Sequence, residues 1–538
     1  MSGEESLTLK LRDSSSSDRS ESQNDNKKKI MEQNLLLTYL LLTPIIGSVL
    51  VLFFKQEQKQ LIRWFGLVVS FLAFIISLVV YFQFNPTETK FQFIHQVIWI
   101  KSLNISYHVG VDGISLLLVL LTTFLTPLTL LSTWKAIEKN VKMFTFSMLF
   151  LEVGMLGVFI SLDIFLFYIF WEAMLIPMYF IIGVWGGERR IYAAVKFFLY
   201  TMFGSLLMLV AIIWLAVYAS SMLGRFTTNL IDLYKVGPTI PHQIQGWMFG
   251  AFFLSFAIKV PIFPLHTWLP DAHVEAPTAG SVILAGVLLK MGTYGLIRFC
   301  LPLFPQSSVQ FAPIISVLAV IGIIYGALVS MVQTDMKKLV AYSSVSHLGF
   351  VVLGIFAMTV ESVQGAVIQM INHGLSTGAL FLLVGVLYER THRREISFYG
   401  GIAKLVPVYA TVLMIASLSS IGLPGLNGFI GEFLILIGSF KSSVLNNWWF
   451  TIFAASGVIF AAVYLLWMYQ RVVFGEVKNE VLKQELTDMN LREMIVIIPI
   501  LIFIVWIGVY PNTFLKLTEV STQSILQQVG TFSINLLK

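Results

Sequence analysis

Apolar segments recur along almost the whole chain, and most are long enough to cross a lipid bilayer. A transmembrane helix needs about 20 mostly apolar residues. The segments that meet this requirement lie near residues 35–54, 61–83, 111–134, 143–162, 163–185, 191–218, 247–264, 279–299, 311–332, 339–358, 363–388, 405–440, 448–470 and 493–511. The pattern predicts an all-α polytopic membrane protein with about fourteen transmembrane helices.

Two of these segments contain helix-breaking residues at membrane depth. Gly422-Leu423-Pro424-Gly425-Leu426-Asn427-Gly428 interrupts the run 405–440, and Pro261 and Pro264 interrupt the seventh segment. Non-helical backbone survives inside a bilayer only where protein or water covers it. A broken helix in each half of a chain indicates inverted repeats with a transport route between them. We therefore expect one repeat in each half of the chain.

Ionisable residues stand inside several of the apolar segments. Three are basic (Lys196, Lys259, Lys290) and three are acidic (Glu152, Glu172, Glu432). A charge at membrane depth is costly, so such residues are candidates for a functional site. We expect Lys259, Lys290 and Glu172 to face the protein interior. The pattern indicates a path for ions or protons through the membrane.

Each of these residues also has a structural interpretation. Lys259 and Lys290 could extend their ammonium groups to the membrane surface. Lys196 begins its segment, so an interfacial anchor competes with a role in the path. Glu152 could serve only helix packing, and Asp163, at a tight turn between two segments, is best explained as a helix cap.

A group of polar residues after the seventh segment superficially suggests a metal site. Its members are His266, Asp271, His273 and Glu275. A loop at the membrane surface explains them better, because Pro264, Pro270 and Pro277 lie among them.

The composition excludes several classes of protein. Hydrophobic residues make up 57% of the 538 residues, charged residues 12%, and the mean hydropathy is +0.82. The single cysteine, Cys300, excludes a cysteine-ligated cluster built by this chain alone. No glycine-rich nucleotide loop is visible. The net charge of +6 is spread over loops, so it is not a nucleic-acid signal.

The distribution of basic residues predicts an orientation. Loops after odd-numbered segments hold 18 Lys and Arg residues, and loops after even-numbered segments hold 6, with Arg298 among the latter. The positive-inside rule places the odd loops in the cytoplasm and both termini on the periplasmic side. Residues 1–30, a polar tail of disordered composition, oppose this through Lys27-Lys28-Lys29. A start at Met31 would remove the conflict.

Several longer motifs resemble a known family. They are Asp112-Gly113-Ile114-Ser115, Trp171-Glu172, Gly186-Gly187-Glu188-Arg189-Arg190, Lys259 through Gly280, Ala341 through His347, Asn372-His373-Gly374 and Gly431-Glu432-Phe433. Together they resemble the antiporter-like membrane subunits of proton-pumping NADH:quinone oxidoreductase, respiratory complex I. Within that family the chain is similar to the M-type subunit, called subunit 4 in mitochondria. The resemblance covers residues 31–515, an antiporter-like transmembrane domain, and leaves 516–538 as a C-terminal tail. It implies two inverted five-helix repeats in that domain, near residues 143–299 and 311–470, each with a broken helix.

The resemblance implies a relay of ionisable groups along the membrane midplane. Its members are Glu172, Lys259, Lys290, His347, His373 and Glu432. Glu172 would pair with Lys259 as a two-state element, since an opposite charge stabilises a buried ammonium. Glu432 would hand the proton onward, and its place just after the break would let a helix N-terminus favour its anion. The two histidines could instead be hydrogen-bonded core residues.

The resemblance also implies that the redox chemistry lies outside this chain. NADH, FMN, iron–sulfur clusters and quinone would belong to partner subunits, and this chain would hold no cofactor or metal. L-type and N-type subunits would be its neighbours in a bacterial inner membrane. Two alternatives remain at this stage. One is a subunit of an Mrp-type cation/proton antiporter, which usually has lysine in place of Glu432, and the other is a scaffold whose buried charges only fix helix packing.

Overall fold

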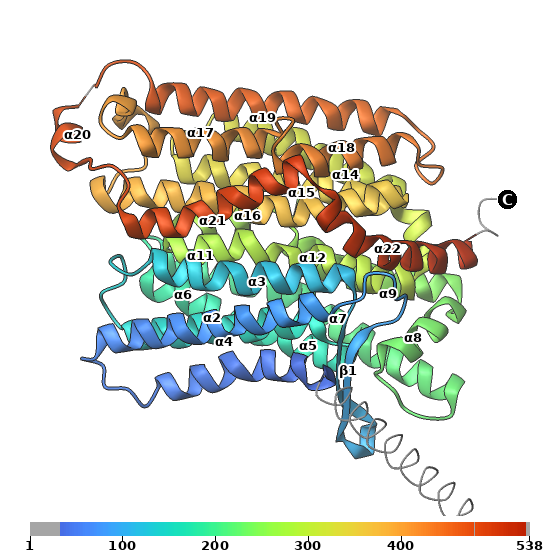
Figure 1. The fold of residues 1–538 in the computed structure, drawn as a ribbon. Coiled ribbons are helices and arrows are strands. Elements are labelled where there is room, and N and C mark those ends of the chain that lie inside the picture. The colour runs from blue at the N-terminus through green and yellow to red at the C-terminus, as the bar shows by residue number, and fades with distance from the viewer. Residues whose placement is uncertain (1–32, 478, 534–538) are drawn as a thin grey trace, which may run out of the picture.

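The computed structural model describes residues 33–477 and 479–533, so the predicted N-terminal tail and Met31 lie outside the described residues. The described chain forms a bundle whose long helices run roughly parallel to one another (Figure 1). In chain order, the helices are Gln33–Val51, α2 (Lys59–Gln83), α3 (Gly113–Ser132), α4 (Val141–Ile160), α5 (Ile164–Ala173), α6 (Leu175–Trp185), α7 (Arg190–Leu223), α8 (Leu230–Val236), α9 (His242–Lys259), α10 (Trp268–Glu275), α11 (Thr278–Ile283), α12 (Leu289–Gly295), α13 (Leu301–Leu303), α14 (Pro305–Met331), α15 (Met336–Ala357), α16 (Val360–Thr391), α17 (Pro407–Ile421), α18 (Asn427–Phe440), α19 (Trp449–Val473), α20 (Glu480–Glu485), α21 (Leu491–Val509) and α22 (Asn512–Ser533).

The helical architecture confirms the predicted fold class. Among the described residues, 12 helices are long and apolar enough to span a bilayer, counting α5 with α6 and the continuous helix α11–α13 as one each. The two predicted broken helices complete the set. One is α9 followed by α10, and the other is α17 followed by α18. The fold is therefore that of a multi-pass membrane protein with about fourteen spans.

Both breaks lie where the sequence predicts them. The helix α9 ends at Lys259, directly before Pro261, and α17 ends before Gly422. Gly422 and Gly425 have φ angles of +84° and +92°. Only glycine adopts this left-handed conformation without strain, so it ends α17 and lets the chain re-enter a helix at α18.

The continuous helix from α11 to α13 departs from regular α-helical geometry twice. Residues 284–288 and 296–300 are π-helical. A π-helical turn shifts the hydrogen-bonding ladder and often marks a functional site. Lys290 follows the first of these turns, and Arg298 lies within the second.

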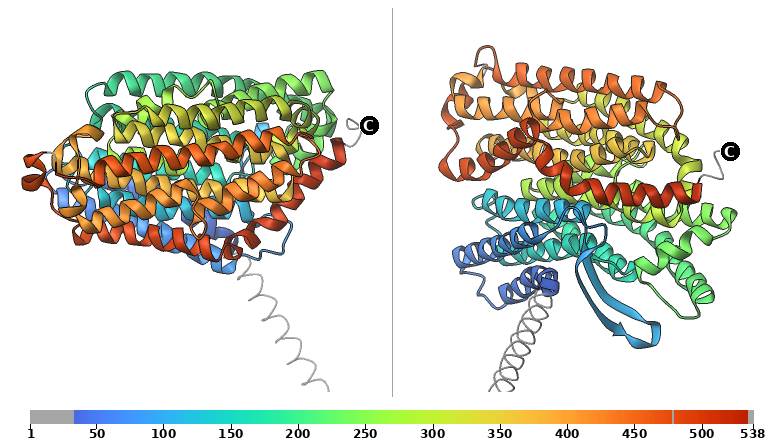
Figure 2. Two further views of the ribbon diagram at one scale, coloured as in Figure 1. Left: turned by 90° about the horizontal axis from the view of Figure 1, so that it is seen from above. Right: turned by 45° about the vertical axis from the view of Figure 1, so that its right-hand side comes forward.

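A two-stranded hairpin is an addition that the sequence analysis did not predict. Its antiparallel strands are β1 (Gln92–Ile100) and β2 (Ile105–Val111), which connect α2 to α3. The hairpin lies at the same end of the bundle as α8 and α22, and it projects clearly in the right-hand view of Figure 2. We call this end, at the right of Figure 1, the hairpin end. The helix α22 occupies much of the segment expected to be a C-terminal tail.

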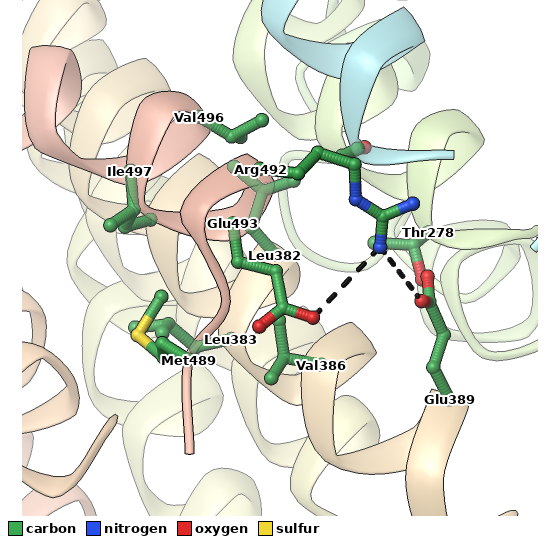
Figure 3. Close-up of a pocket in the computed structure, with 11 residues that line it drawn as sticks. Thr278, Leu382, Leu383, Val386, Glu389, Met489, Arg492, Glu493, Val496 and Ile497 are labelled. Atoms are coloured by element: carbon green, nitrogen blue, oxygen red, sulfur yellow. Dashed lines mark ion pairs between the residues drawn. The ribbon is translucent and has the colours of Figure 1, made fainter. Parts of the chain in front are cut away.

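The opposite end of the bundle carries the loop with α20 and a cluster of ion pairs (Figures 1 and 3). Arg492 lies 3.5 Å from Glu389 and 3.9 Å from Glu493, and Arg390 lies 2.8 Å from Glu493. Ion pairs near the protein surface contribute most to stability when several charges form one network. This network joins the end of α16 to the start of α21, and α16 is the helix that carries His373.

Candidate functional site

Lys259 occupies the last position of α9, inside the protein. Its side chain is buried, as predicted, with 1% exposure. The ammonium nitrogen lies 5.2 Å from the ring centre of Trp171 and 5.7 Å from that of Phe197. It also lies 3.5 Å from the sulfur of Met174. Aromatic faces and a helix C-terminus both favour a cation, whereas burial without a counter-ion opposes one.

Glu172 lies near the end of α5, but it does not form the expected ion pair. Among the ion pairs of the described residues, none joins Glu172 to Lys259. The carboxyl group interacts with Ser205 and Tyr168, and it senses Lys259 only through its electrostatic field. Glu172 is also partly exposed, so the expectation that it faces the interior is fulfilled only in part. In this conformation Glu172 and Lys259 are therefore not paired, and the carboxyl group is engaged with hydroxyl groups instead.

Lys290 is the most deeply buried lysine of the candidate set, with 0% exposure. Its ammonium nitrogen lies 2.6 Å from Nδ1 of His373 and also donates to the carbonyl of Ala285. Ala285 belongs to the π-helical turn, where the altered ladder makes a carbonyl available. The lysine side chain therefore points back along its own helix, toward His373, and cannot reach the surface.

His373 and His347 lie side by side, with ring centres 5.8 Å apart. A cavity of about 10 Å³ lies beside them, lined also by Asn372 and Thr377. Within the described chain, His373 Nε2, Asn372 Oδ1 and Thr377 Oγ1 have no hydrogen-bond partner. A polar cavity of about this volume has room for one water molecule.

Glu432 completes the arrangement on α18. Its Oε1 atom lies 3.0 Å from His347 Nδ1 and accepts a hydrogen bond of 3.1 Å from Gln369. The other ring nitrogen of His347 lies 3.1 Å from the Ser420 hydroxyl, at the end of α17. The effect of the helix dipole is largest in the first turn of a helix. Glu432 is the sixth residue of α18 and lies beyond that turn. His347 and Gln369, rather than the helix terminus, therefore determine how well its anion is stabilised.

The structure thus brings four of the six predicted residues into one sequence of close contacts. Lys290 contacts His373, His373 lies beside His347, and His347 contacts Glu432. Lys259 lies close to the helix of Lys290 through backbone packing, since a Cβ atom on Gly292 would lie 3.1 Å from the Cβ atom of Lys259. Among the described residues, no hydrogen bond joins Lys259 to Lys290.

For most of the other candidate residues, the contacts in the structure indicate a structural role. Lys196 is not isolated, because it forms an ion pair of 2.7 Å with Asp271, and its side chain is 23% exposed. This favours the interfacial anchor. Asp163 caps α5 by accepting from the backbone N–H groups of Phe165 and Leu166, as expected. Glu152 is fully buried on α4, and neither carboxyl oxygen has a hydrogen-bond partner in the described chain.

The polar group after the seventh segment does not assemble into a metal site. Asp271 binds Lys196, and Glu275 accepts from the backbone of Arg189. His266 stacks on Phe263 instead of facing the acids. Within residues 33–477 and 479–533, no group of three or more His, Cys, Asp or Glu side chains could hold a metal ion.

His273 was wrongly placed in a surface loop. It lies on α10 with 0% exposure and stacks on Phe381 at 4.7 Å. Neither ring nitrogen has a hydrogen-bond partner among the described residues. Lys290 and Lys337 both act on it electrostatically, so it lies between the central lysine and the start of α15. The prolines around it indicate a loop, but Pro270 lies inside α10, and Pro264 and Pro277 lie before and after that helix.

Sequence reasoning also missed two buried basic residues. Lys337 is 7% exposed and donates to the carbonyls of Ala276 and Val274. Arg298, which we had counted as a loop residue, is 2% exposed and binds Asp112. The signal that could have revealed Arg298 is its spacing from Lys290, because residues at i, i+4 and i+8 lie on one helical face.

Comparisons with known proteins agree with this geometry. Residues 161–460 match the family described as NADH:quinone oxidoreductase/Mrp antiporter, TM. The chain is 48% identical to NADH-quinone oxidoreductase subunit M of Rhodobacter capsulatus, over 86% of this chain and 90% of that protein. It is 44% identical to NADH-ubiquinone oxidoreductase chain 4 of Arabidopsis thaliana, over 91% and 97%.

Solved structures give the same result. A chain of respiratory complex I from Thermus thermophilus with bound NADH has a TM-score of 0.81 and 31% identity, covering 93% of this chain and 100% of that one. A chain of the Mrp complex from Dietzia sp. DQ12-45-1b has a TM-score of 0.79, but its 17% identity supports the fold alone.

The fold and the buried ionisable groups define a polytopic membrane protein of the antiporter-like class. The chain belongs to the NADH:quinone oxidoreductase/Mrp antiporter family, and within it to the M-type membrane subunits of NADH:quinone oxidoreductase.

Proposed function

We propose that this chain carries protons through the membrane arm of NADH:quinone oxidoreductase along the relay Lys290, His373, His347 and Glu432. The observation that carries the proposal is the continuity of these contacts across four separate spans. Each group can gain or lose a proton, and neighbours at hydrogen-bond distance can exchange one. A water molecule in the cavity beside the histidines would close the widest step.

The pair Glu172 and Lys259 acts as the switch that loads the relay. Burial without a counter-ion disfavours the charged form of a lysine, and a nearby carboxylate restores it. In the conformation described here, Glu172 interacts with Ser205 and Tyr168 instead of pairing with Lys259. Movement of the carboxyl group back toward Lys259 would recharge the lysine and alter the field at Lys290. The two states of the pair therefore couple the relay to an event outside this chain.

The redox chemistry belongs to partner subunits. This chain has one cysteine, Cys300, which is buried. We propose that NADH, FMN, iron–sulfur clusters and quinone are bound by other subunits, and that L-type and N-type subunits flank this chain in the membrane. The exposed apolar faces of α7, α14 and α19 provide surface for such neighbours and for lipid.

The orientation proposed from the basic residues remains after two corrections. The buried residues Arg298 and Lys337 leave the count, so loops after even-numbered spans hold 5 basic residues against 17 in loops after odd-numbered spans. The hairpin end then faces the periplasm of a bacterial inner membrane, and so do both ends of the described chain. We further propose that residues 31–515 form one transmembrane domain with inverted repeats near 143–299 and 311–470. The placement of one broken helix in each segment supports these repeats.

The variant His373→Gln tests the relay. Glutamine can still hydrogen-bond to Lys290 but cannot be protonated near neutral pH, so proton translocation by the assembled complex should fall while assembly persists. The measurement is NADH:quinone turnover with simultaneous recording of the pH gradient in vesicles. His242→Gln is the matched control, because His242 is exposed at the start of α9. Unchanged pumping in His373→Gln would remove this histidine from the path.

A further inference from the structure

A second buried charged cluster lies on the helix of the central lysine, closer to the hairpin end. The guanidinium of Arg298 binds the carboxylate of Asp112 at 2.6 Å. Asp112 is the N-cap of α3 and also accepts a hydrogen bond from the backbone of Ser115. Removing one partner of such a pair leaves a costly buried charge, so the pair needs a reason to be retained.

The donors of Arg298 are occupied on several sides. Its Nε atom donates to the Tyr294 hydroxyl at 3.2 Å, and Nη2 donates to the Ser115 hydroxyl at 3.3 Å as well as to Asp112. Two aromatic rings, those of Phe91 and Tyr294, lie 5.0 and 5.3 Å from the guanidinium carbon. The group is enclosed by fixed partners, which leave little room for water.

The cluster is covered from the hairpin end. The hydroxyl of Ser521, on α22, accepts from the backbone N–H of Gly113 at the start of α3. A Cβ atom on Gly113 would collide with the carbonyl of Leu517, so α22 lies directly on this helix start. The side chain of Asp112 is 10% exposed and that of Arg298 is 2% exposed. The negative end of the pair therefore faces outward, and the positive end faces the protein interior.

Lys290 and Arg298 lie eight residues apart on one helix, about 12 Å along its axis. The lysine points away from the arginine, because its partners are Ala285 and His373. Among the described residues, no side-chain hydrogen bond joins Lys290 to Tyr294 or to Arg298. The hydroxyl of Tyr294 instead donates to the backbone carbonyl of Phe159.

These contacts hold the positive charge of Arg298 in a fixed place between Lys290 and the hairpin end. An arginine does not give up its proton in a protein, so it cannot act as a carrier. Its positive charge also repels a proton that approaches from Lys290, as arginine does in pores that exclude cations. We propose that the Asp112–Arg298 pair, with Tyr294, is a barrier that prevents protons on Lys290 from leaking to the hairpin end. Protons on the lysine then have only the lateral route through His373.

This inference rests on the proposed relay, so its test must separate the two. The variant Asp112→Asn/Arg298→Gln removes both charges and leaves no orphan ion. The complex is reconstituted in vesicles without NADH, a pH gradient is imposed, and its decay is followed with a pH-sensitive dye. We expect the decay to be several-fold faster than for the unmodified complex. Arg225→Gln/Asp232→Asn should leave the decay unchanged, because this pair, at a similar distance of 2.7 Å, has an arginine that is 60% exposed.

A third variant identifies the route of the leak. Adding Lys290→Met to the double variant should restore a slow decay, since the leak begins at the lysine. If the pH gradient decays no faster in the double variant than in the unmodified complex, the proposed barrier is contradicted and the relay is not affected. A leak that persists without Lys290 would also overturn it, because the protons would then bypass the lysine. If the double variant does not assemble, Tyr294→Phe opens the same cluster, and a decay rate equal to that of the unmodified complex would contradict the proposal.

Discussion

Nδ1 of His347 lies 3.0 Å from Oε1 of Glu432, and both side chains are buried. The contact joins α15 to the second half of a broken helix, α18. It resembles the contact between Lys290 and His373, in which a histidine again meets an ionisable group on a neighbouring span. The two pairs meet where the histidine rings lie side by side, next to the small polar cavity, and this arrangement makes a lateral route possible.

The similarity of these two pairs predicts the effect of Glu432→Lys. A lysine at this position would face His347 as Lys290 faces His373, so the chain already contains a precedent for the contact. Gln369, which now donates to Glu432, would have to turn its carbonyl oxygen toward the new ammonium. We expect partial proton pumping, measured as the ratio of protons translocated to NADH oxidised. Complete loss in an assembled complex would show that the relay requires an acid here.

The switch predicts that Glu172→Gln and Lys259→Met assemble normally but pump poorly. Glu172 forms no ion pair in the conformation described here, so its neutral isostere leaves no buried charge without a partner. Pumping and coupled NADH:quinone turnover should both fall, because the lysine can no longer be recharged. Glu361→Gln is the control, since the side chain of Glu361 is 40% exposed in an ion pair with Lys441. Full activity in Glu172→Gln would contradict the switch.

Close packing beside Lys259 predicts a stability effect for Gly292→Ala. A methyl group there would lie 2.7 Å from Val260 and 3.0 Å from the carbonyl of Phe256, so the broken helix must move. Overpacking of this kind costs about 1–3 kcal/mol. The thermal stability of the purified complex should fall. In Gly246→Ala, on the helix α9 that carries Lys259, the new methyl group meets nothing within 4 Å, and stability should be unchanged.

The sequence predicts the fold better than it predicts the contacts of the site. The breaks after Lys259 and at Gly422 follow from local chemistry, because helix-breaking residues are clustered at both places. A single proline is not enough, since Pro127, Pro313 and Pro499 lie inside helices. The burial of Lys290 follows from its apolar neighbours in the chain. Tertiary contacts, by contrast, leave little local signal. Nothing near Lys196 in the sequence indicates that Asp271 binds it.

Residues near span ends were the most difficult to place. Arg298 lies near the end of an apolar segment, where a charged side chain usually extends to water, and only its contact with Asp112 shows that it is buried. His273 lies among prolines that suggest a loop, although it is enclosed between two spans. The turn of Glu172 toward Ser205 depends on the conformation, which a sequence pattern does not encode.

The most direct test of the lateral relay is Glu432→Gln. Glutamine keeps the shape of the side chain and its hydrogen bond to Gln369 or His347, but it cannot ionise. The measurement is quinone reduction by the assembled complex with simultaneous recording of the vesicle pH gradient. We predict normal assembly and loss of most of the proton translocation. Pumping at the rate of the unmodified complex would show that Glu432 is structural and that protons leave Lys290 by another route.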